Sequence, residues 1–315
     1  MTALVSILIP CHNAAPWLAE TLECALGQTW PHKEIIVVDD GSRDESLAIA
    51  RRFEARGVTV ITQPNRGASA ARNAAWTASR GDWLQFLDAD DLLSPDKIAR
   101  QMEMAAKVGA ETALAGRWSR FTSSPADADF TPQPLCMDAA PVDWLIVKFE
   151  QNAMMHPAAW LISRELAKRA GPWDETLSLD DDGEFFTRVV LAARAVHCCQ
   201  AATSYYRSGL PGSLSGAKSE RAWQSAYRSL ELSADRLRAV EDSARTRHAC
   251  ATVFQRYIYE AYPRGAECRR RARARVENLG GSALAPEGGG WFQLWRKFLG
   301  WRVAKRLEIL RTRTS

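Results

Sequence analysis

The sequence predicts an α/β fold with a mostly parallel central sheet flanked by helices, followed by a mainly helical C-terminal extension. Short apolar runs alternate with helical segments over the first third of the chain, and acidic clusters directly follow two of those runs. Strands that alternate with helices join through right-handed crossovers and form parallel sheets. Ligands bind such sheets outside the carboxyl ends of the strands, where the acidic clusters would lie.

The expected strands are short apolar runs at residues 5–10, 34–38, 58–62 and 83–87. Between them we expect helices over 17–26, 44–56 and 68–79, with Gly27 and Gly57 ending the first two. Ser94 and Pro95 predict the N-cap and the first position of another helix. Residues 122–141 predict a long loop, whereas 185–193 and 219–262 predict helices.

The net charge of +4 is unevenly distributed along the 315 residues. Residues 264–315 carry 13 Lys and Arg against 4 Asp and Glu, whereas residues 1–263 carry 28 against 33. The basic character therefore belongs to the C-terminal tail and says little about the main domain. Apolar residues make up 46% of the chain, which is ample for a buried core.

Seven cysteines with no CxxC pair are typical of reduced thiols in a cytosolic protein rather than of a disulfide framework. The apolar opening has no preceding basic residue and is expected to be a buried strand instead of a signal peptide. No stretch approaches the 18 apolar residues of a membrane span. We therefore expect a cytoplasmic protein whose membrane contact, if any, is peripheral.

Three acidic clusters are the candidate chemical groups. Asp88 and Asp90 follow an apolar strand, and two carboxylates at this spacing can hold Mg²⁺ or Mn²⁺ together with phosphate oxygens. The Asp39-Asp40 pair follows another strand, and a carboxylate there can accept a hydrogen bond from an imide N–H. Both clusters have a simpler interpretation as polar turns that cap the next helix.

The third cluster, Asp181-Asp182, precedes a predicted helix. Crowded carboxylates raise one another's pKa, which favours proton acceptance near neutrality. The alternative is simple capping, because acids suit the N-terminal end of a helix. The chain lacks a GxSxG elbow, a GxxxxGK[ST] loop and a GxGxxG fingerprint, which weakens hydrolase, kinase and dehydrogenase interpretations.

Taken together, the motifs resemble glycosyltransferase family 2, inverting enzymes with the GT-A fold and a DxD motif. The resemblance covers about residues 4–215, through the segments 5–13, 28–31, 34–42, 65–67, 71–73, 86–91, 181–188, 206–207 and 213–215. Cys11 and His12 depart from the family's first motif, and Asp181 replaces the more usual Glu. The frequent His after the Tyr206-Arg207 pair is missing, so no third metal ligand is assigned.

The resemblance implies a role for each matching residue. Asp40 would read the nucleotide base with Asp39 supporting the same pocket, and Asp88 with Asp90 would bind Mn²⁺ or Mg²⁺ and the diphosphate. Asp182 would be the catalytic base beside Asp181, and the spacing to Arg188 fits this assignment. The third acid, Asp180, leaves the assignment open by one position. The remaining residues of the expected nucleotide-sugar site are Pro10, Asn13, Arg72 and Ala89.

The implied reaction is inverting transfer of a sugar from a nucleotide diphosphate, with a UDP-sugar expected, to the hydroxyl of a saccharide or lipid-linked acceptor in cell-surface polysaccharide or glycolipid synthesis. The expected catalytic domain spans 1–218, with nucleotide-sugar binding in 1–118 and the acceptor and base part in 119–218, followed by the extension 219–315. The alternatives are an inactive sugar-nucleotide-binding protein and a nucleotidyltransferase.

Composition predicts a separate role for the tail. Aromatic residues and cations interleave between 291 and 306, and at helical spacing Trp291, Trp295, Phe298 and Arg302 form one stripe. Such a stripe is typical of peripheral contact with an anionic membrane. The alternative is that these aromatics pack back on the catalytic domain. Nucleic-acid binding by the arginines of residues 269–275 is disfavoured, because no recognised nucleic-acid fold accompanies the charge.

Overall fold

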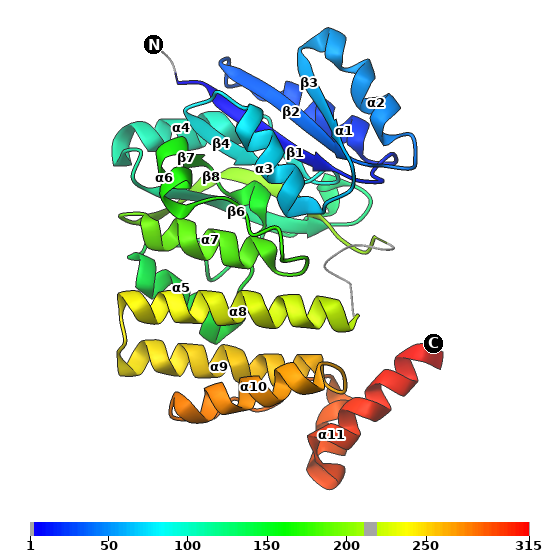
Figure 1. Ribbon diagram of the computed structural model, residues 1–315, viewed down its shortest axis with the longest axis vertical. Coiled ribbons are helices and arrows are strands. Elements are labelled where there is room, and N and C mark those ends of the chain that lie inside the picture. The colour runs from blue at the N-terminus through cyan, green and yellow to red at the C-terminus, as the bar shows by residue number, and fades with distance from the viewer. Residues whose placement is uncertain (1–2, 211–218, 315) are drawn as a thin grey trace.

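The computed structural model of the protein describes residues 3–210 and 219–314. The α/β prediction is confirmed: a parallel-rich sheet lies among helices, and further helices follow it toward the C-terminus. In Figure 1 the blue and cyan N-terminal strands form one end of the molecule, and helices α8, α9 and α10 lie together beyond α7 at the other. The motif 213–215 lies outside the described residues.

The elements up to residue 207 alternate strands with helices. The strands are β1 (Val5–Cys11), β2 (Lys33–Asp40), β3 (Val58–Gln63), β4 (Trp83–Phe86), β5 (Leu92–Leu93), β6 (Ala113–Phe121), β7 (Ile162–Ser163) and β8 (Val196–Arg207). The helices are α1 (Leu18–Leu26), α2 (Ser46–Arg52), α3 (Ala68–Ala78), α4 (Lys97–Val108), α5 (Pro141–Gln151), α6 (Arg164–Ala170) and α7 (Asp181–Ala192). Short 3₁₀ turns occur at Glu54–Arg56, Pro125–Asp127 and Pro157–Ala159.

The main sheet has the strand order β3-β2-β1-β4-β7, with β7 antiparallel to β4 and the other pairs parallel. A smaller sheet has the order β5-β8-β6. Strand β1 is buried along its whole length because helices cover both faces of the sheet. Ile7 and Ile9 pack in one apolar cluster with α1, whereas Leu8 packs in the other with α3.

This topology places the acidic clusters at one edge. Strands β1, β2 and β4 are parallel, so their carboxyl ends point in the same direction. Asp39 and Asp40 are the last residues of β2, and Asp88 follows β4 by two positions. The sequence prediction that both clusters lie at the carboxyl edge of the sheet is therefore correct.

Two local predictions are wrong. Helix α4 begins at Lys97 with Asp96 as its N-cap, because Ser94 instead closes a turn in which its carbonyl accepts from the N–H of Lys97 at 3.0 Å. The expectation of uniformly reduced thiols also fails, since a disulfide joins Cys136 and Cys198. The disulfide ties the loop before α5 to β8, a tertiary contact that cysteine spacing alone does not reveal.

The C-terminal helices are α8 (Glu220–Val240), α9 (Ala244–Ala261), α10 (Ala266–Asn278) and α11 (Gly290–Thr314). Helices α8, α9 and α10 share the apolar cluster that contains α5 and α7. The predicted stripe of Trp291, Trp295, Phe298 and Arg302 is not continuous. Gly300 has φ 74° and kinks α11 between Phe298 and Arg302. No helix of the described chain is long and apolar enough to cross a membrane.

Candidate active site

A cavity of about 1350 Å³ opens at the carboxyl edge of the main sheet. Loops after β1, β2 and β4 form one side of it, and the start of α7 forms another. The cavity brings together nearly all of the sequence-predicted site residues: Pro10, Asn13, Asp40, Arg72, Asp88, Ala89, Asp90, Asp181 and Asp182. Asp39 lies directly behind this wall and is 3% exposed. Residues far apart in the sequence thus share one site.

Arg72 connects two of the acidic clusters. It lies in the second turn of α3, where its buried guanidinium donates to Asp88 Oδ1 and to Asp181 Oδ2 at 2.8 Å each. Its face stacks on Trp173, 4.5 Å from the ring centroid. Burial alone would lower the pKa of Arg72, but the charges of Asp88 and Asp181 outweigh burial and raise it. Arg72 is therefore a permanently charged bridge.

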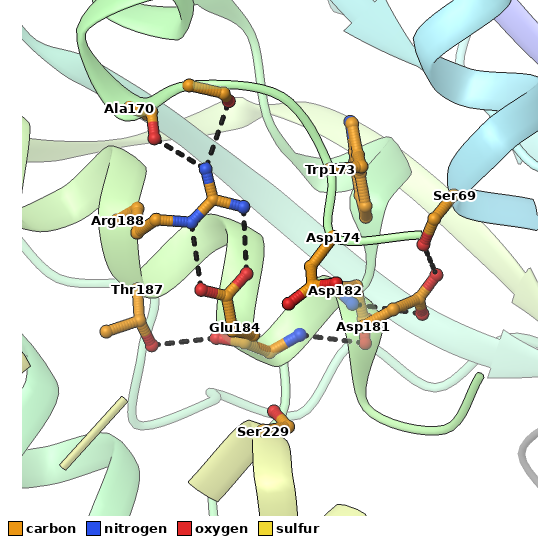
Figure 2. Close-up of polar contacts among 12 residues, drawn as sticks. Ser69, Ala170, Trp173, Asp174, Asp181, Asp182, Glu184, Thr187, Arg188 and Ser229 are labelled. Atoms are coloured by element: carbon orange, nitrogen blue, oxygen red, sulfur yellow. Dashed lines mark hydrogen bonds and ion pairs between the residues drawn. The ribbon is translucent and has the colours of Figure 1, made fainter. Parts of the chain in front are cut away.

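The three consecutive aspartates have different environments. Asp181 accepts from Arg72 and from Ser69 Oγ, both at 2.8 Å, as Figure 2 shows for Ser69. Asp180 has φ 62° and turns toward α8, where Ser229 Oγ donates to its Oδ2 at 2.6 Å. Asp182 Oδ1 accepts from the N–H of Gly183 at 2.9 Å. Within the described residues, no side chain donates a hydrogen bond to Asp182.

The pKa of Asp182 follows from these surroundings. Burial raises it to about 7, and the neighbouring Asp181 and Asp180 charges add to the effect. Arg72 and Lys148 act in the opposite direction. Lys148 reaches from α5, and its Nζ donates to the carbonyl of Gly183 at 3.1 Å. Asp182 thus combines access to the cavity with a proton affinity near neutrality, which suits general acid–base work.

The loop after β4 contains three carboxylates with separate partners. Asp91 is buried: its Oδ1 accepts from the N–H of Arg207 at 2.9 Å, and its Oδ2 lies 2.9 Å from His156 Nδ1. Burial lowers the pKa of His156 to about 3, so this ring is neutral and helps to fix the loop. Asp88 and Asp90 instead face the cavity.

Asp88 and Asp90 have the chemistry of a cation site. Burial, followed by the charges of Asp91 and Asp88, raises the pKa of Asp90 to about 7. Hard cations prefer such carboxylate oxygens. Across residues 3–210 and 219–314 no cluster of three or more His, Cys, Asp or Glu side chains forms a complete metal site. Asp88 and Asp90 are the cavity residues that could hold such an ion together with phosphate oxygens.

Asp39 and Asp40 differ in how many hydrogen-bond acceptor positions of their carboxylates are occupied. Asp40 accepts from Gln63 Nε2 at 2.7 Å and from the N–H groups of Arg66 and Gly67 at 2.9 and 2.8 Å. These three bonds hold the loop after β3 and leave about one of the four acceptor positions of the Asp40 carboxylate for a ligand. Asp39 Oδ2 accepts from the N–H of Ser42 at 3.3 Å, whereas its buried Oδ1 has no partner.

Sequence reasoning missed three residues around the aspartates. Ser69, Lys148 and Trp173 contact the site from α3, α5 and the loop before α7, and nothing in their local sequence signals this. Arg188, which stands at the spacing that the family resemblance implies, makes its contacts outside the cavity. It pairs with Glu184 at 2.8 Å and donates to the carbonyls of Ala170 and Gly171, and these contacts, shown in Figure 2, hold α7 in place.

A parallel sheet with a carboxylate-lined cavity at its carboxyl edge defines an α/β protein that binds its ligand there. The chain belongs to glycosyltransferase family 2, whose model matches residues 6–169. It is therefore a glycosyltransferase.

The curated relatives agree with this assignment. The chain is 28% identical over 210 residues to glycosyltransferase GlyG of Streptococcus pneumoniae, a match covering 62% of this chain and 68% of the relative. It is 38% identical over 103 residues to the putative teichuronic acid biosynthesis glycosyltransferase TuaG of Bacillus subtilis, covering 32% of this chain and 41% of the relative.

The solved structures agree on the fold. Staphylococcus aureus TarS 1-349 in complex with UDP-GlcNAc matches with a TM-score of 0.62 at 17% identity, covering 88% of this chain and 89% of that one. The mannosyltransferase PcManGT of Pyrobaculum calidifontis, in complex with GDP-Man and Mn²⁺, matches with a TM-score of 0.56 at 18% identity, covering 98% and 88%. The fold is GT-A.

Proposed function

We propose that this glycosyltransferase moves a sugar from a nucleotide diphosphate, with a UDP-sugar as the expected donor, to an acceptor hydroxyl with inversion at the anomeric carbon. The observation that carries the proposal is the pairing of two carboxylate sites in one cavity. Asp182 has a pKa of about 7 at one side, and Asp88 with Asp90 lie at the other. Arg72 connects the two sides through Asp181.

The chemical step needs one proton acceptor. Asp182 takes the proton of the acceptor hydroxyl while that oxygen forms a bond to the anomeric carbon. The bond from this carbon to the diphosphate oxygen breaks on the opposite face, and the diphosphate departs with the electron pair. Asp181 is unsuited to accept the proton because Arg72 and Ser69 already bind its carboxylate. Positioning and fixed charge supply most of the acceleration.

The residues at the other side fit the donor. Asp88 and Asp90 would hold Mn²⁺ or Mg²⁺, which would supply charge neutralisation for the departing diphosphate. Arg72 places a fixed positive charge next to Asp88 and orients it. Asp40 reads the base through its remaining acceptor position, and Asp39 with its unpaired Oδ1 supports the same pocket. Pro10, Asn13 and Ala89 form the adjoining wall.

Similar proteins support the proposed donor and acceptor. TarS was solved with UDP-GlcNAc and PcManGT with GDP-Man, so the test below includes both nucleotides. TuaG is described for teichuronic acid biosynthesis, which favours a saccharide or lipid-linked acceptor in cell-surface polysaccharide synthesis at the cytoplasmic membrane face. Nucleic acid is a poor partner, because Arg270, Arg271 and Arg275 of α10 pair with acidic side chains.

The test is a donor screen with the full chain. UDP-Glc, UDP-GlcNAc, UDP-Gal and GDP-Man are each added with Mn²⁺ or with EDTA, and thermal stabilisation and released nucleoside diphosphate are measured. We expect one nucleotide class to stabilise the protein with Mn²⁺ and to be hydrolysed or transferred slowly. Stabilisation without release in both wild type and Asp182→Asn would identify an inactive binding protein. Released sugar 1-phosphate in place of nucleoside diphosphate would identify a nucleotidyltransferase.

A further inference from the structure

Helix α11 is fixed to the protein along one side. Phe292 is 2% exposed and Ala304 is fully buried, although both lie near the end of the chain. The ring of Trp301 contacts Tyr259 and Tyr262, with centroids 4.9 and 5.1 Å apart. Arg296 also donates to the carbonyl of Pro286 at 3.1 Å. The aromatics that pack back on the protein are therefore a subset, and they hold the helix in a defined orientation.

Four large apolar side chains in the first half of the same helix face solvent. Trp291, Leu294, Phe298 and Leu299 are 57%, 47%, 78% and 52% exposed. Their spacing of three, seven and eight residues from Trp291 places them on one face of a helix. We call these four residues the α11 ridge. Soluble proteins rarely display so many large apolar side chains together unless another surface covers them.

The charges around the ridge identify the kind of surface. Residues 290–314 contain seven Lys and Arg and one acidic residue, Glu308, which lies 3.2 Å from Lys305. Lys297 is exposed next to the ridge residue Phe298. Arg302 and Arg306 are exposed beyond the kink, with their guanidinium groups over the rings of Trp301 and Tyr262 at 5.5 and 5.6 Å. The kink at Gly300 turns the second half of α11 back, so that Arg311 lies over the ring of Trp291 at 5.8 Å. Cations thus border the apolar side chains from both halves of the helix.

We propose that the α11 ridge docks on an anionic lipid surface. Trp, Phe and Leu enter the boundary between headgroups and acyl chains, while the flanking cations contact anionic headgroups. A protein partner would more often match an apolar ridge with an apolar groove and opposite charges at fixed positions, whereas a fluid anionic surface accepts cations on several sides. Docking requires neither donor nor metal, so its failure would leave the proposed sugar transfer intact.

The test is co-sedimentation of the full chain with vesicles of phosphatidylcholine alone or with 30% phosphatidylglycerol. We expect pelleting with the anionic vesicles at low salt and much less with the neutral ones. The double variant Leu294→Ser/Phe298→Ser removes two ridge side chains and should lower the partition coefficient at least about tenfold. The matched control is Val240→Ser, because Val240 is 60% exposed at the end of α8, away from the ridge.

A second variant separates charge from apolar insertion. Lys297→Glu/Arg302→Glu keeps the ridge and should lose binding to anionic vesicles, and high salt should weaken wild-type binding in the same way. Thermal melting and nucleotide release check that each variant is folded. The proposal is overturned if the wild type stays in the supernatant, or if the ridge variant pellets as well as Val240→Ser. If the wild type is a dimer in sedimentation velocity and the ridge variant is a monomer, the ridge is instead an interface with a second copy of the chain.

Discussion

Replacing Asp182 by Asn tests the assignment of the catalytic base most directly. Asn has nearly the same shape as Asp, so the cavity and the contact from the N–H of Gly183 should persist. It cannot accept a proton as the carboxylate does. Removal of a general base typically costs about 10²- to 10⁴-fold in rate, and we expect kcat to fall within this range. The donor dissociation constant should change little, because Asp88 and Arg72 are untouched.

The pH dependence of kcat gives a second quantitative test. A base must be deprotonated to act, and the pKa of Asp182 is raised to about 7. About one tenth of the wild-type protein is then active at pH 6 and about nine tenths at pH 8, so kcat should rise roughly tenfold over this interval. Lys148→Met removes a charge that lowers this pKa and should move the rise to higher pH, whereas Lys148→Arg should restore it.

The assay is nucleoside diphosphate release at saturating donor and acceptor, followed between pH 5.5 and 8.5. Asp181→Asn is the matched control. It removes the partner of Arg72 and should raise the KM for the donor while the rise of kcat with pH survives. An Asp182→Asn enzyme that keeps more than about a tenth of the wild-type kcat, or that keeps the pH dependence, would refute the assignment. Loss of the pH dependence in Asp181→Asn alone would move the base by one position.

Two other substitutions and a stability measurement on Asp182→Asn give independent tests. Asp90→Ala should lower transfer about 10²-fold or more, which release assays measure. It should not lower the Tm in thermal melts, because the raised pKa of Asp90 indicates that its ionised form is unfavourable in the folded protein. Arg72→Lys should lower transfer about 10- to 100-fold, since an ammonium cannot fork between Asp88 and Asp181; kcat and donor KM measure this. Asp182→Asn should raise the free energy of unfolding at pH 8 by up to about 4 kcal/mol and leave it unchanged near pH 4. The folded-state pKa of about 7 lies above the usual 3.8, so the ionised Asp182 destabilises the fold once the pH exceeds 3.8, increasingly so up to about pH 7. Thermal melts at both pH values measure the effect as a change in Tm.

The sequence predicted the sheet edge well because the relevant signals are local. A run of buried residues specifies a strand such as β1, and the residues that follow a parallel strand must lie at its carboxyl end. Neither conclusion requires knowledge of distant contacts. The same reasoning places Asp40, Asp88 and Asp182 in one site only with the help of the family resemblance, since the start of α7 reaches the cavity through tertiary packing.

Contacts between distant elements were not predictable in this way. Ser69 and Asp181 are 112 positions apart, and the disulfide between Cys136 and Cys198 spans 62 positions. Neither pair has a periodicity or a motif that would mark it. The kink at Gly300 was missed for another reason. A glycine within a helical stretch is compatible both with a straight helix and with the positive φ that Gly300 adopts, so the local sequence does not decide between them.

The three adjacent aspartates show why composition alone could not assign the base. Asp180, Asp181 and Asp182 are chemically identical, and mutual crowding gives no reason to choose one of them as the base. The fold separates them by giving each a different partner. Asp180 binds Ser229 of α8, and Asp181 binds Arg72 and Ser69 of α3. The carboxylate of Asp182 is left facing the cavity, where burial and its two neighbours hold its proton affinity near neutrality. Helix α8 therefore contacts the proposed site, because its Ser229 binds the carboxylate of Asp180 while the carboxylate of Asp182 has no side-chain donor in the described part of the chain.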